Sequence, residues 1–136
     1  MANLTQLRAM MPPLEDWNRP FWEGTRQYEF RLQYGQDGIA RFPGRPSDTL
    51  DPGSPLEWRA ASGRGRLWSW TVMHQNYLPA YADEIPYPVG LIQLDEGPLV
   101  VSLLRGDVAA LECDTPMKVV FEKVDDEWVL PRFERA

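Results

Sequence analysis

Few side chains in this sequence could act as nucleophiles or proton carriers. The single histidine, His74, has no serine or cysteine directly beside it. A base that lacks a nucleophile and an orienting partner is a weak catalytic candidate. We therefore predict that His74 packs at the end of a strand and hydrogen-bonds to its neighbours.

The cysteine and the paired acids are also poor catalytic candidates. Cys113 is the single cysteine, which excludes an internal disulfide and any multi-cysteine metal site, and we expect it to be partly buried and unreactive. The pairs Asp83-Glu84 and Asp95-Glu96 each offer two carboxylates, but neighbours on a loop point apart, so we predict that they are solvated. No residue is predicted to be catalytic.

Three acids between two predicted strands could be mistaken for a cation site. Asp37, Asp48 and Asp51 carry the oxygen ligands that Ca²⁺ and Mg²⁺ prefer, but their spacing matches no ligand loop. Acids among glycine and proline are usually solvated turn residues. We predict no metal.

Length and charge narrow the class of protein. A chain of 136 residues can bury one core, so we expect one domain with an appendage. The formal charge of −6 disfavours nucleic acid, whose phosphates need a basic surface. The N-terminal residues lack the basic-then-apolar order of a secretory signal, and no apolar run reaches membrane-spanning length, so we expect a cytoplasmic protein with no membrane contact.

The second half of the chain reads as five strands. A long strand from Gly65 to His74 is rich in aromatic and β-branched residues, and glycines at its start leave room for a bulge. Two hairpins follow, with apolar runs at 89–94 and 99–104 and then at 115–124 and 128–133. This order is typical of a five-stranded OB-type barrel, although another small barrel or a sandwich stays open. Residues 108–113 are expected to form a helical turn or an extended connector.

The first half predicts short helices and an irregular segment. Residues 4–11 have the apolar spacing of a short helix, and a second helix is expected to start near Asp16 or Asn18 and end near Tyr28 or pass into a strand. Residues 35–55 are dominated by glycine, proline, aspartate and serine, and have little with which to make a core. Such a long irregular stretch suggests the remnant of a small module.

Several segments, in this order, resemble one known family. They read RPFWEGTRQYEFRLQY, GRGRLWSWTVMH, PYPVGLIQLDEG, LECDTPMKV and WVLPRF. The sequence is similar to the acyl-CoA-associated OB-fold family, long described as a domain of unknown function. The resemblance implies a mainly β protein with an N-terminal helical segment (1–33), a rubredoxin-like zinc ribbon (34–58) and an OB-fold barrel (59–136).

The ribbon departs from the family pattern. Where the family places two CxxC pairs, this chain has residues 34–37 (YGQD) and 48–53 (DTLDPG), without any thiol. Losing all four thiolates should abolish zinc binding. We therefore expect a degenerate, metal-free ribbon with a mobile tip, anchored on the barrel by packing of Phe42, Pro43, Leu50 and Trp58.

The resemblance also implies a function. Family members are mostly small, non-catalytic partners of thiolase-fold enzymes or acyl-CoA hydratases, so we expect an accessory subunit with no cofactor of its own, which can share an acyl-CoA ligand with its partner. For His74 the resemblance suggests contact with an acyl-CoA phosphate or a partner carboxylate. A free-standing module that binds acyl-CoA or another small ligand is the alternative, and a single-stranded nucleic-acid binder is disfavoured by charge.

An excess of large rings indicates where a partner or ligand would bind. Trp68, Trp70 and His74 share one face of the long strand, and a small barrel cannot enclose every tryptophan, so at least one of Trp22, Trp68, Trp70 and Trp128 should be exposed. Tryptophans that fill a barrel corner are the competing interpretation. The predicted contact residues are Phe21, Trp22, Trp68, Trp70, His74, Tyr77, Tyr81 and Tyr87.

Overall fold

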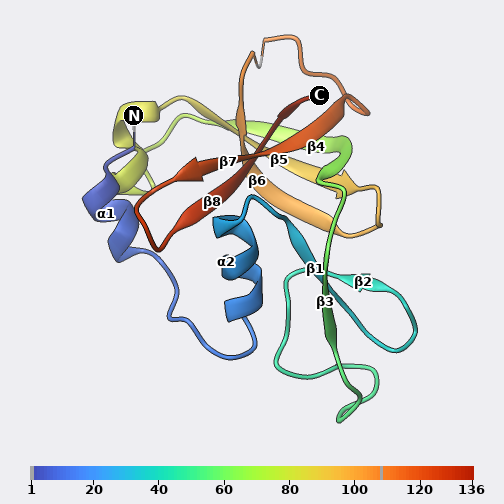
Figure 1. Cartoon of the computed structure of the whole chain (residues 1–136). Coiled ribbons are helices and arrows are strands. Elements are labelled where there is room, and N and C mark those ends of the chain that lie inside the picture. Colours follow the sequence, from blue (N-terminus) through green and yellow to red (C-terminus); the bar gives the residue numbers. More distant parts are fainter. Residues whose placement is uncertain (1, 108) are drawn as a thin grey trace.

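The computed structural model describes residues 2–107 and 109–136, and it contains two sheets and three short helices (Figure 1). The elements are α1 (Leu4–Ala9), α2 (Arg19–Arg26), β1 (Arg31–Tyr34), β2 (Ala40–Arg41), β3 (Glu57–Ala60), β4 (Arg64–Met73), the 3₁₀ helix η1 (Pro79–Glu84), β5 (Tyr87–Leu94), β6 (Leu99–Arg105), β7 (Pro116–Lys123) and β8 (Val129–Arg135). Val108, in the predicted connector, lies outside the described residues, and the rest of that connector consists of turns joined by residues 111–112 without regular structure.

Strands β4 to β8 close into a barrel in the order β4-β5-β6-β8-β7. The barrel closes through one parallel pair, in which Leu104 of β6 lies opposite Phe133 of β8. Strands β1, β2 and β3 form a separate three-stranded sheet in the order β2-β1-β3, which projects from one end of the barrel (Figure 1). The prediction of a mainly β protein with a five-stranded barrel is confirmed.

Strand β4 serves two sides of the barrel. Its first residues pair with both β5 and β7, and Gly65 lies opposite Leu94 and Met117. A Cβ on Gly65 would clash with the carbonyl oxygen of Gln93, so this close approach of two strands requires glycine. The register shifts between Leu67 and Ser69, so the bulge lies beyond the glycines where we expected it.

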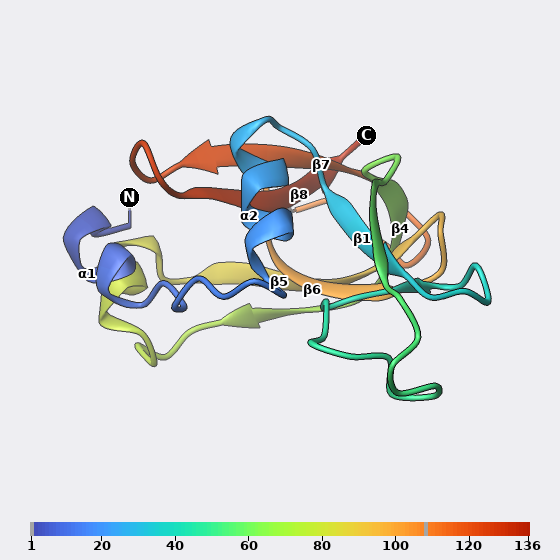
Figure 2. The ribbon, with the colours of Figure 1, turned by 60° about the horizontal axis from the view of Figure 1, so that its bottom comes forward.

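One apolar core joins the barrel to the first sheet. Inward side chains of the barrel, including Leu67 and Phe133, cluster with Phe30 and with Phe21 of α2. The ring of Phe30 meets that of Phe133 edge-on, with centroids 5.9 Å apart. Helix α2 lies against β1 and β8 and so covers the junction (Figure 2).

The anchoring of residues 34–58 was predicted in part. Phe42 and Trp58 pack against the shared core, as expected. Leu50 does not, because its side chain is 79% exposed, and Pro43 is exposed as well. The chain turns outward after Asp48, whose carboxylate accepts a hydrogen bond from the backbone N–H of Leu50.

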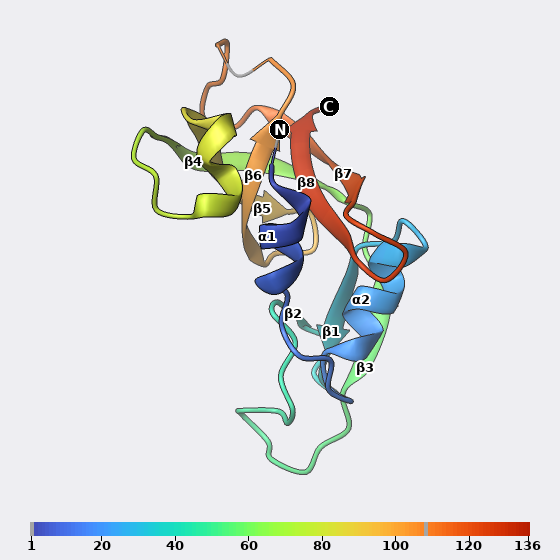
Figure 3. The same ribbon diagram turned by 90° about the vertical axis from the view of Figure 1, so that its left-hand side faces the viewer.

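A second apolar cluster lies outside the barrel. It joins α1 and η1 to the outer side of β5 and β6, and Figure 3 shows α1 lying beside η1. Leu7 is the buried residue of α1, the N–H of Asn3 donates to the carbonyl of Ala80, and Arg8 pairs with Asp125 and Glu127. Among the described residues, no helix has the length and apolar character needed to cross a membrane.

Candidate functional site

The predicted contact residues fall into two sets. Trp68 and Tyr77 are exposed, by 56% and 64%, and Trp70 and His74 are exposed as well. The prediction that one of four tryptophans would be exposed is therefore confirmed. His74 lies just past the end of β4, as expected, but it is exposed, so the prediction that its ring packs is wrong.

The remaining candidates face inward. Phe21, Tyr81 and Tyr87 are buried, and Trp22 is half-buried against Trp128. The two tyrosines were expected on an exposed linker, but the linker folds back as η1 and places their rings 5.7 Å apart in the second cluster. The exposure expected for Tyr81 and Tyr87 is therefore wrong, whereas contact with a partner or ligand stays a prediction for all eight residues.

Two of the groups first considered for chemistry also differ from expectation. Cys113 is exposed on a turn, where its thiol lies 3.7 Å from the carbonyl oxygen of Trp68. Glu84, expected to be solvated, is mostly buried and pairs with Arg105 at 3.4 Å. Among the described residues, the thiol of Cys113 contacts only a backbone carbonyl, and Glu84 pairs with an arginine. Neither group is therefore arranged for catalysis.

An apolar groove of about 610 Å³ lies between α1, the segment from β4 to η1, and the outer side of β5 and β6. Its floor is made of buried side chains and its rim of exposed ones. The floor contains Leu7, Tyr81, Tyr87, Leu103, Leu130 and Arg132, and the exposed rim contains Met10, Tyr77, Leu78 and Val101. We call this feature the groove.

The sequence of β5 and β6 explains why the groove is apolar. Val89 lies opposite Leu103, and Leu91 lies opposite Val101, so these four side chains share the outer face. The alternate residues, such as Ile92, point into the core. Both faces of this hairpin are therefore apolar, which is typical of strands that are covered on both sides. Val101 is nevertheless 69% exposed.

Arg132 is the one charged residue among those that line the groove in the described part of the chain. It is buried, its Nη2 donates to the hydroxyl of Tyr81 at 2.7 Å, and its Nε lies 3.4 Å from Glu122. Burial would by itself raise the pKa of Glu122, but Arg105 and then Arg132 hold that pKa below its usual value. Glu122 therefore stays charged and holds both guanidinium groups in place.

The chemistry open to the groove is binding. Its described lining contains no histidine, cysteine or carboxylate, and the hydroxyl of Ser102 donates to the carbonyl of Leu103. It can take up apolar groups, and Arg132 can donate to an oxygen. Sequence reasoning missed Met10, Val101 and Arg132. The continuous apolar run of β6, which needs cover on both faces, was a signal for Val101, whereas the sequence carries no comparable signal for Met10 or Arg132.

Known proteins share this architecture. Residues 58–122 match the protein family described as the ChsH2 C-terminal OB-fold domain. The 3-oxo-4,17-pregnadiene-20-carboxyl-CoA hydratase alpha subunit of Mycobacterium tuberculosis is 31% identical over 128 residues, 93% of this chain, which spans 40% of that protein's length. A DUF35 domain-containing scaffold protein of Pyrococcus furiosus is 33% identical over 101 residues, which are 73% of this chain and 72% of that protein.

Solved structures agree with these sequence matches. A chain of the Ltp2-ChsH2(DUF35) aldolase superposes with a TM-score of 0.80 at 27% identity, over 92% of this chain and 98% of that one. A DUF35 protein from Sulfolobus solfataricus shares the fold, with a TM-score of 0.60 at 14% identity over 87% and 84% of the two chains. The barrel, the N-terminal helices and the sequence matches together show that this chain belongs to the DUF35 family.

Proposed function

We propose that this chain is an accessory subunit that binds an acyl-CoA-processing enzyme through the groove. The observation that carries this proposal is the exposed apolar rim, where Met10, Tyr77, Leu78 and Val101 surround a buried floor. Methionine and aromatic side chains are enriched where proteins meet, and a soluble monomer gains nothing by exposing a contiguous apolar surface.

The named relatives support the class of partner. One is described as the alpha subunit of a CoA-ester hydratase, one as a scaffold protein, and one solved chain comes from an aldolase complex. By this analogy the partner is an acyl-CoA hydratase or another acyl-CoA-processing enzyme. A thiolase-fold partner and a cytoplasmic location are part of the proposal on the ground of the sequence analysis alone. We assign this chain a positioning role, because the described residues that line the groove contain no nucleophile with a base.

The bulge in β4 offers a second contact. Trp68 falls at the register shift and is turned outward, next to Trp70 on the same strand. Bulges often redirect a side chain at functional sites. An interface that covered the groove and also reached Trp68 would bury two apolar regions, one at the middle of β4 and one at its C-terminal end.

One observation favours a second candidate function, a free-standing module that binds acyl-CoA or another small ligand. The groove, at about 610 Å³, lies within the roughly 300–1,000 Å³ that is usual for ligand pockets. Arg132 and the hydroxyl of Tyr81 could bind an acyl carbonyl or carboxylate there. In this case a CoA thioester would bind to the isolated chain.

The test is capture of the partner from the native host with a tagged chain. We expect a stoichiometric complex with an enzyme of the hydratase or thiolase class, identified by mass spectrometry. Val101→Glu should abolish the complex, because it places a charge on the apolar rim. Leu50→Glu is the matched control, since Leu50 is also largely exposed but does not line the groove, and it should retain the complex.

Two outcomes would count against the proposal. One is a complex that Val101→Glu leaves intact, which would mean that the partner binds a surface other than the groove. The other is calorimetry in which octanoyl-CoA binds the isolated chain and Val101→Glu weakens that binding while no enzyme is captured. The second outcome would favour the ligand-binding module instead.

A further inference from the structure

The ribbon, residues 34–58, does not fit the zinc ion that the family resemblance implies. The two loops that would carry the ligands contain Asp37, Asp48 and Asp51 but no thiol or imidazole. Within residues 2–107 and 109–136, no three histidine, cysteine or carboxylate side chains converge as a metal site. Structural zinc is held by four nitrogen or sulfur ligands, so another interaction must hold these loops.

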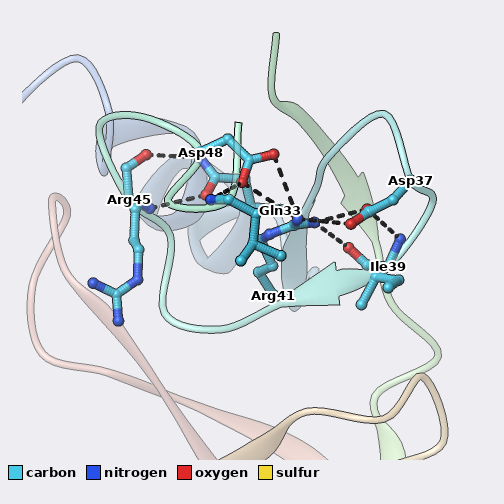
Figure 4. Close-up of polar contacts among 7 residues, drawn as sticks. Gln33, Asp37, Ile39, Arg41, Arg45 and Asp48 are labelled. Carbon is cyan, nitrogen blue, oxygen red and sulfur yellow. Dashed lines mark hydrogen bonds and ion pairs between the residues drawn. The ribbon is translucent and has the colours of Figure 1, made fainter. Parts of the chain in front are cut away.

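A guanidinium group lies between the two loops. Figure 4 shows Arg41, on β2, reaching Asp37 on one side and Asp48 on the other. Its Nη1 donates to Oδ1 of Asp37 at 3.0 Å and to the carbonyl of Ile39 at 2.8 Å. Its Nη2 donates to Oδ2 of Asp37 at 2.9 Å and lies 3.4 Å from both carboxylate oxygens of Asp48. Arg41 thus forms a two-pronged contact with one loop and a charge contact with the other.

Asp48 is the one buried residue in segment 36–56, at 4% exposed. A buried carboxylate is costly unless it is paired and hydrogen-bonded. The carboxylate of Asp48 accepts a hydrogen bond from the N–H of Leu50 at 3.0 Å and forms an ion pair with Arg41. Our sequence prediction that Asp48 is a solvated turn residue is therefore wrong, and its burial indicates a structural role.

The backbone around this cluster leaves space for it. A Cβ on Gly35 would lie 2.7 Å from Nη1 of Arg41 and 2.8 Å from Oδ2 of Asp48. On the other side of the loop, the buried amide of Gln33 donates to the carbonyl of Arg45 at 3.0 Å and accepts its N–H at 2.9 Å (Figure 4). The loop that carries Asp48 is thus joined to β1 as well as to β2.

We propose that Arg41 takes the structural place of the metal in this ribbon. Its guanidinium, with Asp37 and Asp48, forms a clamp that joins the two loops. The apolar contacts of the ribbon lie at its base, through Phe42 and Trp58, so its outer part depends on polar contacts, the clamp together with the bonds between Gln33 and Arg45. The ribbon then folds without metal and does not respond to chelators, whether or not the chain binds the proposed partner.

The test measures amide hydrogen exchange in residues 35–56 of the full chain. In the wild-type protein the exchange should be the same with and without EDTA, and elemental analysis should find no stoichiometric zinc. Arg41→Met should speed exchange in this segment by roughly tenfold or more, because it leaves Asp48 buried without a countercharge. Exchange in β5 and β6 of the barrel should not change.

Two variants complete the design. Arg45→Met is the matched control, because the side chain of Arg45 points away from the cluster (Figure 4) and only its backbone contacts Gln33. It should exchange like wild type. Arg41→Lys keeps the charge but loses the two-pronged geometry, so its exchange should be intermediate.

If Arg41→Met unfolds the whole chain, Arg41→Lys and the EDTA comparison still test whether the clamp holds the ribbon. One zinc per chain, opening by EDTA, or wild-type exchange in both Arg41 variants would overturn the proposal.

Discussion

Arg41 and Arg132 have the same physical role at two places in the chain. Each guanidinium pairs with a carboxylate that the fold shields from water, fully for Asp48 in the ribbon and in part for Glu122 beside the groove. Arginine suits this role, because its charge persists at any working pH and its planar donors meet two oxygens at once. At both sites a charged pair, instead of a metal or a disulfide, fixes the position of a neighbouring surface.

Asp37 gives the ribbon a specific dependence on pH. The hydrogen bond from Arg41, helped by the N–H of Ile39, lowers the pKa of the Asp37 carboxyl below its usual value. A group with a depressed folded-state pKa contributes stability above its unfolded pKa, near 3.9, and loses it as the pH falls through the folded value. Asp37→Asn should therefore have a lower free energy of unfolding than wild type in urea at pH 7. This difference between the two proteins should shrink as the pH falls below about 4.

The control for this pH dependence is Asp51→Asn. Asp51 is exposed in the same ribbon, and no hydrogen bond or ion pair of its side chain occurs among the described residues. Its stability should match that of wild type at every pH. A gap between Asp37→Asn and wild type that persists unchanged at pH 3 would show that the charge of Asp37 is not what matters.

At the scale of the elements, β4 depends on one close approach. A Cβ at Gly65 would collide with the carbonyl oxygen of Gln93 and lie 2.9 Å from its carbon, both of which are backbone atoms that cannot rotate away. Gly65→Ala should lower the free energy of unfolding by about 1–3 kcal/mol or more. Urea denaturation followed by circular dichroism measures this. Ser69→Ala, at an exposed position on the same strand, should be close to neutral.

Helix α1 is held mainly by one apolar side chain. Leu7 is its buried residue and forms part of the groove floor, whereas the ion pairs of Arg8 with Asp125 and Glu127 are solvent-exposed. Leu7→Ala should cost about 2–4 kcal/mol and speed exchange in α1 and η1. Arg8→Ala should cost much less than Leu7→Ala, because exposed ion pairs contribute little. The reverse order of the two effects would show that charge, not packing, holds α1.

The elements differ in how well their sequence predicts them. The barrel strands were predictable, because long apolar runs alternate with turn residues such as Gly97 and Pro98. Tyr81 and Tyr87 were not, since tyrosines among prolines and acids resemble an exposed linker until η1 brings them back onto the barrel. The clamp at Arg41 was equally hidden, because the burial of Asp48 depends on how two loops meet in three dimensions.

At the scale of the whole molecule, the ribbon and the barrel share one core, although the sequence divides them at residue 58. Phe30 is buried at the junction, where its ring meets those of Phe21, Phe42 and Phe133. Elements that share a core should unfold together, since neither can keep its apolar surface covered alone. This predicts one cooperative unfolding transition for the chain, with the outer ribbon opening locally at lower cost.

The substitution Phe30→Ala tests that coupling. It removes the ring on which Phe42 of the ribbon and Phe133 of the barrel both pack, and it should lower the free energy of unfolding by about 3–5 kcal/mol. Because the cavity opens between the two parts, urea transitions followed through exchange in β1 and in β6 should shift together. Phe121→Ala, at a half-buried position on β7, should shift both signals much less. Loss of protection in β1 alone, with β6 unchanged, would mean that the ribbon and the barrel are separate folding units that merely touch at Phe30.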